Sequence, residues 1–216
     1  RVRDEVSKLV MSGMPERGFE ILRELKLLPF IVPELEEGYG VGQNKHHVYT
    51  VWEHNLRALQ YAAQKEWPLE VRMAALLHDV AKPRTKKGEG SDSTFYGHDV
   101  VGAKMTLQIV GRLKYPKQFI EKVAKLVRYH LFYYNVDEVT ESSVRRLIAK
   151  VGLDDMEDLI RVRVCDRIGS GVPKAEPYKL RHFRFLVEKL SRDAVSVKML
   201  RIKGDDVMKI TGIEPG

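Results

Sequence analysis

An all-α fold is predicted by three features of the sequence. Apolar residues recur every three or four positions through most of the 216-residue chain, which is the spacing of one helix face. Helix-start and helix-stop residues, such as Thr50 with Glu53 and the later Gly152, separate these stretches. No β-rich region is present. At this length and with 44% hydrophobic residues, we expect one packed body with lobes.

The first forty residues predict a small helical lobe. A first helix over residues 2–11 ends at a break between Gly13 and Pro15, and a second helix follows. A short third helix is expected around residues 31–35. The predicted inward residues of the first two helices are Val2, Val6, Leu9 and Val10, then Phe19, Leu22, Leu25 and Leu28.

A glycine-rich polar loop over residues 37–49 marks a lobe boundary. It contains His46 and His47, and adjacent loop histidines are more often exposed or substrate-facing than metal ligands. The next helix begins with a capping box formed by Thr50 and Glu53. His54 falls on its apolar stripe with Val51, Leu59 and Ala62.

The chain is organised around AALLHDVAKP, residues 74–83. A helix carrying Met73, Leu76, Leu77 and Val80 is built to be buried, so His78 and Asp79 are carried inward. An unpaired buried carboxylate is costly, and a divalent cation held by imidazole and carboxylate would offset its charge. The sequence therefore predicts a metal site at this pair.

The remaining elements follow in order. A long loop over residues 82–99 ends at His98 and Asp99, where a helix begins, and Pro116 starts another that ends at His130. Thr140 caps a helix that closes at Gly152. Predicted inward residues of these three helices are Ala103, Leu107 and Val110, then Phe119, Val123, Leu126 and Val127, then Val144, Leu147 and Ile148.

The next helix, capped by Asp154 and Glu157, carries Asp166 on its apolar face. From Pro173 a C-terminal helical tail is predicted, linked through residues 195–197 to a closing helix in GDDVMKITGIEPG. The inward residues of these elements are Leu159 and Val162, then Leu180, Phe183, Leu186, Val187 and Leu190.

Each polar candidate also has an ordinary explanation. His54 alone would be a satisfied core histidine, and His130 at a helix C-terminus would interact with the helix dipole. Asp166 could pair with a neighbouring arginine. Together, however, six nitrogen or oxygen ligands on inward faces indicate a divalent metal site suited to Mn, Fe, Ni, Zn or Mg. The six are His54, His78, Asp79, His98, His130 and Asp166.

The composition indicates the kind of partner and the cellular environment of the protein. The net charge of +7 predicts an acidic partner, and clustering in RRLIAK, KLRHFRF and VKMLRIKG favours RNA over lysines that only solubilise. The single cysteine, Cys165, excludes an internal disulfide and is consistent with packing in a reducing cytoplasm. We expect no membrane span and no signal peptide. A helical pattern that starts at Arg1 suggests a piece of a longer protein.

The order H, HD, H, H, D resembles the HD superfamily of metal-dependent phosphohydrolases. RMAALLHDVAKPRT, FYGHDVVGA and RIKGDDVMKITGIEPG resemble the C-terminal half of bacterial tRNA nucleotidyltransferases and related poly(A) polymerases, and residues 1–35 resemble their RNA-binding neck and body helices. The resemblance implies a lobe over 1–40, an HD domain over 41–172 and a tail over 173–216. In this family the nucleotide-adding head carries a Gly-Ser motif followed by paired aspartates. The GSG at 169–171 is not followed by such aspartates, so we expect that this chain does not add nucleotides on its own.

The resemblance also implies roles. One metal would be held by His54, His78, Asp79 and Asp166, and a second by His98 and His130 with Asp79 bridging. A one-metal site would need only the first four. Asp79 and Lys82 would be catalytic, and the substrate-binding residues would be Lys82, Arg84 and Arg167.

The implied activities act on phosphoesters, such as 2′,3′-cyclic nucleotides or RNA-end phosphates. Two alternatives remain open. In the first, the chain is a non-catalytic tRNA-binding body with a structural metal. In the second, it is a free-standing HD nucleotide hydrolase.

Overall fold

A computed structural model describes residues 1–43, 48–136, 138–171, 177–191 and 204–211. Within these ranges the regular elements are helices, apart from one antiparallel bridge between Lys87 and Thr94. The predicted all-α class is confirmed. His46, His47 and the predicted link at residues 195–197 lie outside the described ranges. No helix of the described parts is long and apolar enough to cross a membrane.

The N-terminal lobe contains α1 (Val2–Met11), α2 (Pro15–Glu24), the 3₁₀ turn η1 (Leu28–Phe30) and α3 (Pro33–Glu36). Half of its predicted stripe is buried, namely Val6, Val10, Phe19 and Leu28. The prediction for Val2 was wrong, since this residue begins α1 and its side chain is 55% exposed. The prediction for Leu25 was wrong, since this side chain is 62% exposed. The reason is that α2 ends at Glu24 and Lys26 adopts a left-handed conformation with φ 57°, which turns the chain.

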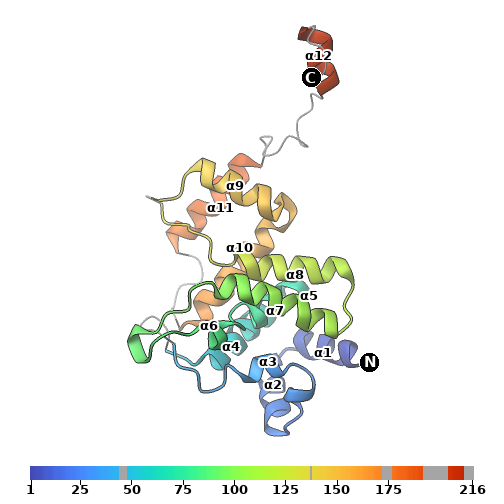
Figure 1. Ribbon diagram of the computed structural model, residues 1–216, viewed down its shortest axis with the longest axis vertical. Helices are drawn as coiled ribbons and strands as arrows, with labels where there is room; N and C mark the ends of the chain where they lie inside the picture. Colours follow the sequence, from blue (N-terminus) through green and yellow to red (C-terminus); the bar gives the residue numbers. More distant parts are fainter. Residues whose placement is uncertain (44–47, 137, 172–176, 192–203, 212–216) are drawn as a thin grey trace.

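Five helices form the body, and α5 lies among them (Figure 1). Their bounds are α4 (Val51–Gln64), α5 (Leu69–Leu77), α7 (His98–Arg112), α8 (Lys117–Tyr129) and α10 (Leu153–Gly169). Residues 71–77 of α5 are all buried and the helix contacts α1, α4, α8 and α10, so its C-terminal end lies in the middle of the body. The predicted capping box of α4 is confirmed, because Thr50 Oγ1 accepts from the Glu53 amide at 3.3 Å.

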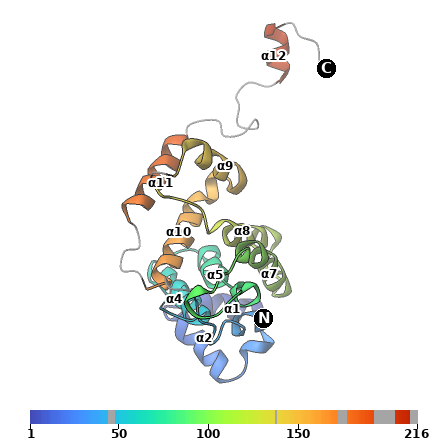
Figure 2. The same cartoon turned by 60° about the vertical axis from the view of Figure 1, so that its left-hand side comes forward.

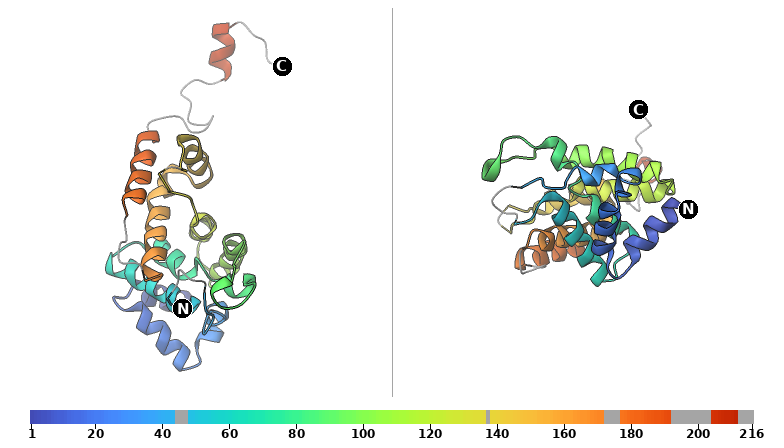
Figure 3. Two further views of the ribbon diagram at one scale, coloured as in Figure 1. Left: turned by 90° about the vertical axis from the view of Figure 1, so that its left-hand side faces the viewer. Right: turned by 90° about the horizontal axis from the view of Figure 1, so that it is seen from below.

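The smaller elements lie around this body. The long loop of residues 82–99 contains the short α6 (Lys82–Thr85) and the 3₁₀ turn η2 (Gly90–Asp92). α9 (Glu141–Val151) packs against α11 (Tyr178–Leu190), as two views show (Figure 2 and Figure 3). α12 (Gly204–Thr211) is drawn apart from the other helices (Figure 1).

Two further predictions were wrong in detail. Leu107 is 43% exposed, because α7 presents Met105, Thr106 and Ile109 to its neighbours instead. Asp154 does not cap α10. The helix begins at Leu153, after Gly152 with φ 88°, so Asp154 lies in the first turn, where a negative charge still suits the helix dipole.

A buried arginine joins the N-terminal lobe to the body. The Arg72 guanidinium on α5 donates to the Trp67 carbonyl at 2.8 Å and to the Val10 and Ser12 carbonyls at 3.3 Å. These carbonyls lie at or just beyond the ends of helices, where backbone acceptors lack helical partners. The negative end of the helix dipole therefore faces this buried charge.

Candidate metal centre

The fold brings all six predicted ligands together in the interior. Each lies on or directly beside a different part of the helical body, and all six are buried. α4 and α10 supply one residue each from their interiors, whereas the ends of α5, α7 and α8 supply the others. The residues are His54 on α4, His78 at the C-cap of α5 with Asp79 after it, His98 at the start of α7, His130 at the C-cap of α8 and Asp166 on α10.

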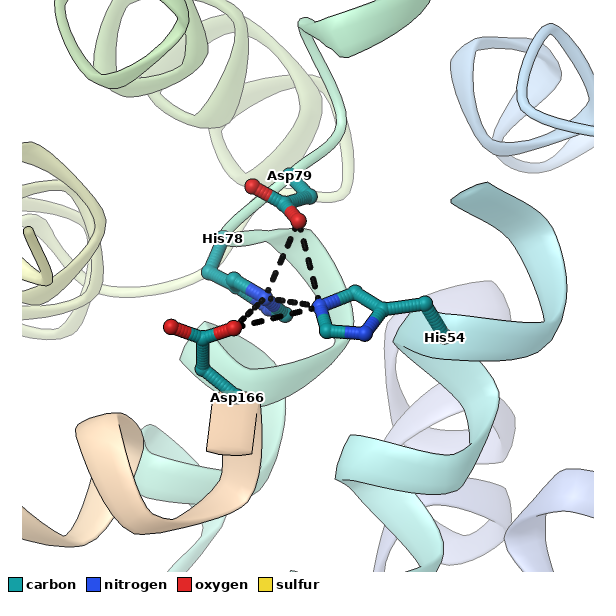
Figure 4. Close-up of side chains that lie close together, drawn as sticks. All are labelled: His54, His78, Asp79 and Asp166. Atoms are coloured by element: carbon teal, nitrogen blue, oxygen red, sulfur yellow. Dashed lines mark hydrogen bonds and ion pairs between the residues drawn. The ribbon is translucent and has the colours of Figure 1, made fainter. Parts of the chain in front are cut away.

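The first group contains His54, His78, Asp79 and Asp166 (Figure 4). The Nε2 atoms of His54 and His78 are 2.8 Å apart. Asp79 Oδ2 is 3.1 Å from His54 Nε2, and Asp166 Oδ1 is 3.4 Å from the same nitrogen. Two imidazoles and two carboxylates thus direct one atom each to a common point.

The second group contains Asp79, His98 and His130. It uses the other carboxylate oxygen, because Asp79 Oδ1 is 3.2 Å from His98 Nε2 and 3.7 Å from His130 Nε2. Asp79 therefore belongs to both groups, with one oxygen directed to each. This division is the one expected of a carboxylate that bridges two cations.

Three histidines are oriented by the same local hydrogen bond. The Nδ1 atoms of His78, His98 and His130 lie 2.8, 2.6 and 2.6 Å from the carbonyl oxygen three residues earlier. A carbonyl only accepts, so each Nδ1 carries a proton. In the neutral ring, Nε2 is then an unprotonated donor atom that points into the cluster.

The residues present fit a divalent cation. The Nε2 atoms of His98 and His130 are buried and make no hydrogen bond, which is costly for a polar atom unless something else binds it. The donor set consists of imidazole nitrogens and carboxylate oxygens without a thiolate. Such sets suit Mn, Fe, Ni, Zn or Mg.

Burial and charge shift the ligand pKa values in opposite directions. Burial alone would raise the pKa of Asp79, but Lys82 and His78 hold it well below its usual range. Burial lowers the pKa of His78, yet the carboxylates of Asp79 and Asp166 outweigh this and raise it to about 10. Burial and the nearby His78 charge lower the pKa of His130 to about 3. Without metal, the His78 ring therefore carries a positive charge and His130 stays neutral.

The close approach of α10 to α4 requires a glycine. A Cβ atom on Gly169 would lie 2.7 Å from the His54 carbonyl oxygen and 3.1 Å from His54 Nδ1. Both distances are shorter than ordinary contacts. The absence of a side chain at Gly169 thus lets Asp166, one turn earlier on α10, reach His54.

An open pocket of about 720 Å³ leads from the surface to the cluster. Asp79, His98 and Asp166 lie among its lining residues, so both groups of candidate ligands are reached from it. It is also lined by Lys82, Arg163 and Arg167. A phosphate-sized anion in the pocket would therefore meet three cationic side chains.

The substrate-binding candidates differ in their surroundings. Lys82 is buried, with Nζ 2.6 Å from both Asp79 Oδ2 and Gln43 Oε1. Arg167 donates to the Tyr134 hydroxyl at 2.8 Å. Arg84 instead forms a two-point ion pair with Glu37, at 2.7 and 2.6 Å, and is not among the pocket-lining residues.

Two residues of the site are not among the predicted site residues, although Arg163 was considered as a partner of Asp166. Arg163 Nη1 donates to Asp166 Oδ2 at 2.6 Å, so the ordinary salt bridge considered for Asp166 exists alongside its place in the cluster. The spacing of three residues on one helix was an available signal for this pair. Gln43, which holds Lys82, comes from the glycine-rich loop, and no local pattern marks it.

Comparison with known proteins gives two family matches. The HD domain family matches residues 51–168, and the family described as the probable RNA and SrmB-binding site of polymerase A matches residues 1–38. These ranges fall within the predicted divisions at residues 41–172 and 1–40.

Individual relatives carry related names. An A-adding tRNA nucleotidyltransferase from Deinococcus radiodurans is 34% identical over the whole chain, and a CC-adding tRNA nucleotidyltransferase from Thermus thermophilus is 32% identical over the whole chain. A multifunctional CCA protein from Nitrosococcus oceani is 32% identical over 70% of the chain. The chain spans about half the length of the first two, 50% and 49%.

Proposed function

Because the chain belongs to the HD-domain family, we propose that its pocket hydrolyses phosphoesters with divalent cations held by the buried histidines and aspartates. The observation that carries this proposal is the pair of ligand groups that share Asp79 and are reached from an open pocket. The second group favours two cations over one. When bound, such cations supply a water of lowered pKa and neutralise charge on the phosphate.

The protein's own residues would bind and orient the substrate. Arg163 and Arg167 line the pocket on α10 and would pair with phosphate oxygens, which suits the planar donor geometry of a guanidinium. Lys82 carries its charge beside Asp79 and would offset the negative charge of the phosphate there. Arg84, held by Glu37, would have to leave that ion pair to take part.

The finer substrate assignment rests on the relatives. Their names concern tRNA, and the match over residues 1–38 concerns RNA binding. We therefore propose RNA-end phosphates or 2′,3′-cyclic nucleotides as substrates and RNA as a partner. The chain spans about half the length of these relatives. We therefore propose that an N-terminal head domain with nucleotide-adding activity is present if this chain is part of a longer protein.

Hydrolysis of a 2′,3′-cyclic nucleotide with Mn²⁺, Ni²⁺ or Mg²⁺ tests this function. We expect Asp79→Ala and His78→Ala to lower kcat by at least about 100-fold, because each removes a metal ligand. Arg112→Gln, which breaks an exposed ion pair with Glu34 away from the pocket, should keep full activity. Metal content is measured on the same samples.

A second function is favoured by the RNA-binding match and the net charge of +7. In that case the chain is an RNA-binding body whose metal is structural. Wild-type protein that contains metal and binds tRNA, but hydrolyses none of the phosphoesters with any of the three cations, would establish this alternative and exclude the hydrolase.

A further inference from the structure

α11 carries a row of aromatic side chains that packing does not explain. Tyr178, His182 and Phe185 follow one another at intervals of four and three residues, with ring centroids 6.2 and 6.5 Å apart. Tyr178 and Phe185 are 64% and 59% exposed. The opposite face of α11, with Leu180 and Phe183, is buried in the core.

The segment of residues 131–135 connects this helix to the pocket. Its side chains alternate: Phe132 stacks on Phe183 of α11 with centroids 4.6 Å apart, whereas Leu131 and Tyr133 line the pocket. Tyr133 is 78% exposed. The same short segment therefore provides an aromatic ring at the pocket and an anchor on α11.

A polar contact brings the start of the aromatic row to the same place. Lys179, next to Tyr178, donates to Asn135 Oδ1 at 3.1 Å. This contact brings the first turn of α11, which carries Tyr178, close to the segment that carries Tyr133. Figure 2 shows α11 beside α9 and above the body that contains the cluster.

The positive charge of α11 indicates which kind of partner would bind its exposed aromatic face. The helix contains four basic residues and one acidic residue, and exposed Lys179 and Arg181 lie between the rings in sequence. A helix from another protein would be expected to need a continuous apolar face, which these cations interrupt. Flat rings beside positive charge match a single strand of nucleic acid, whose bases stack and whose phosphates are anionic.

We propose that Tyr178, His182 and Phe185 form a stacking surface for single-stranded RNA whose end lies in the pocket. The placement of the end rests on the proposed function, whereas the stacking surface does not. Each base would lie against a ring, and the neighbouring phosphates would face Lys179 and Arg181. RNA several nucleotides long would therefore bind more tightly than a mononucleotide.

Fluorescence anisotropy with a ten-nucleotide RNA tests the surface. Tyr178→Ala and Phe185→Ala should each weaken binding by about 5- to 150-fold without changing its salt dependence. Arg181→Gln should instead reduce the salt slope by about 0.7, the value for one phosphate contact on a single strand. Phe185→Trp keeps a stacking face and should retain wild-type affinity.

The control is Leu107→Ala, which removes an exposed apolar side chain from α7 and should leave binding unchanged. Hydrolysis of a 2′,3′-cyclic mononucleotide should be the same in wild type and Tyr178→Ala, while KM for the RNA rises in the variant. Wild type that hydrolyses nothing, together with weakened binding in the variants, would reject the pocket's function and retain the surface. Alanine variants that bind RNA as wild type does would overturn the surface.

Discussion

At the scale of single residues, the buried acids of the cluster are paired with cations even without metal. His78, with its pKa raised to about 10, stays protonated while Asp79 and Asp166 stay ionised. Lys82 and Arg163 contact one carboxylate each. This arrangement explains how so many polar side chains remain buried, because each acid has cationic partners.

The protonated His78 predicts that metal-free stability falls as pH rises, whereas metal affinity increases. For the metal-free protein, the His78 contribution to stability is fully present below its unfolded pKa of about 6.5 and is lost as pH rises through about 10. Metal binding must expel the Nε2 proton, so metal affinity should rise with pH by up to tenfold per unit for each proton released, roughly. Calorimetric titration of Mn²⁺ or Ni²⁺ between pH 6.5 and 9 measures this, and an affinity independent of pH would contradict it.

His130 behaves differently below neutrality. Its pKa of about 3 lies under the unfolded value, so the folded state is favoured above about pH 6.5 and this stability is lost as pH falls toward 3. Taken together, these two histidines place the highest stability of the metal-free protein near pH 6.5. Thermal melts of chelator-treated protein across pH 4 to 10 check the position of this maximum.

At the scale of elements, the site depends on how closely α10 approaches α4. Gly169→Ala should push the helices apart, since the new Cβ would meet the His54 carbonyl oxygen at 2.7 Å. We expect a loss of about 1–3 kcal/mol of unfolding free energy and weaker metal binding. Denaturant melts and metal titration measure the two effects.

The matched control is Gly111→Ala on α7, where a Cβ would have nothing within 4 Å. It should stabilise the protein by about 0.5–1 kcal/mol, because alanine favours a helix more than glycine does. Equal effects of the two substitutions would show that the close approach at Gly169 is unimportant.

At the scale of the whole molecule, the candidate ligands come from all five helices of the body. A cation in the first group would link α4, α5 and α10, and a cation in the second would link the end of α5 with α7 and α8. Binding of one cation to the folded state alone adds about 2.7 kcal/mol at a metal concentration of 100 times Kd. Metal removal should therefore lower Tm, and re-addition should restore it. Tm is followed with and without a chelator, using Asp166→Asn as a variant of weakened binding. A Tm unaffected by chelation of metal-loaded protein would contradict cations bound between these helices.

The sequence alone predicts the helices and the identity of the six cluster residues. Both depend on local patterns: His54 and Asp166 fall on apolar stripes, and the Thr50 capping box marks where α4 begins. The same patterns do not determine where each helix ends. Leu25 and Leu107 were assigned inward because periodicity does not reveal where a helix stops or which neighbour its face meets.

Only the tertiary structure decides how these residues act together. It directs one oxygen of Asp79 to each ligand group, engages Arg84 with Glu37, and brings Gln43 to Lys82. These contacts join residues far apart in the chain, and their partners are selected by packing across helices. Spacing along a sequence encodes which face a side chain occupies, but the position of that face in space depends on every helix that packs around it.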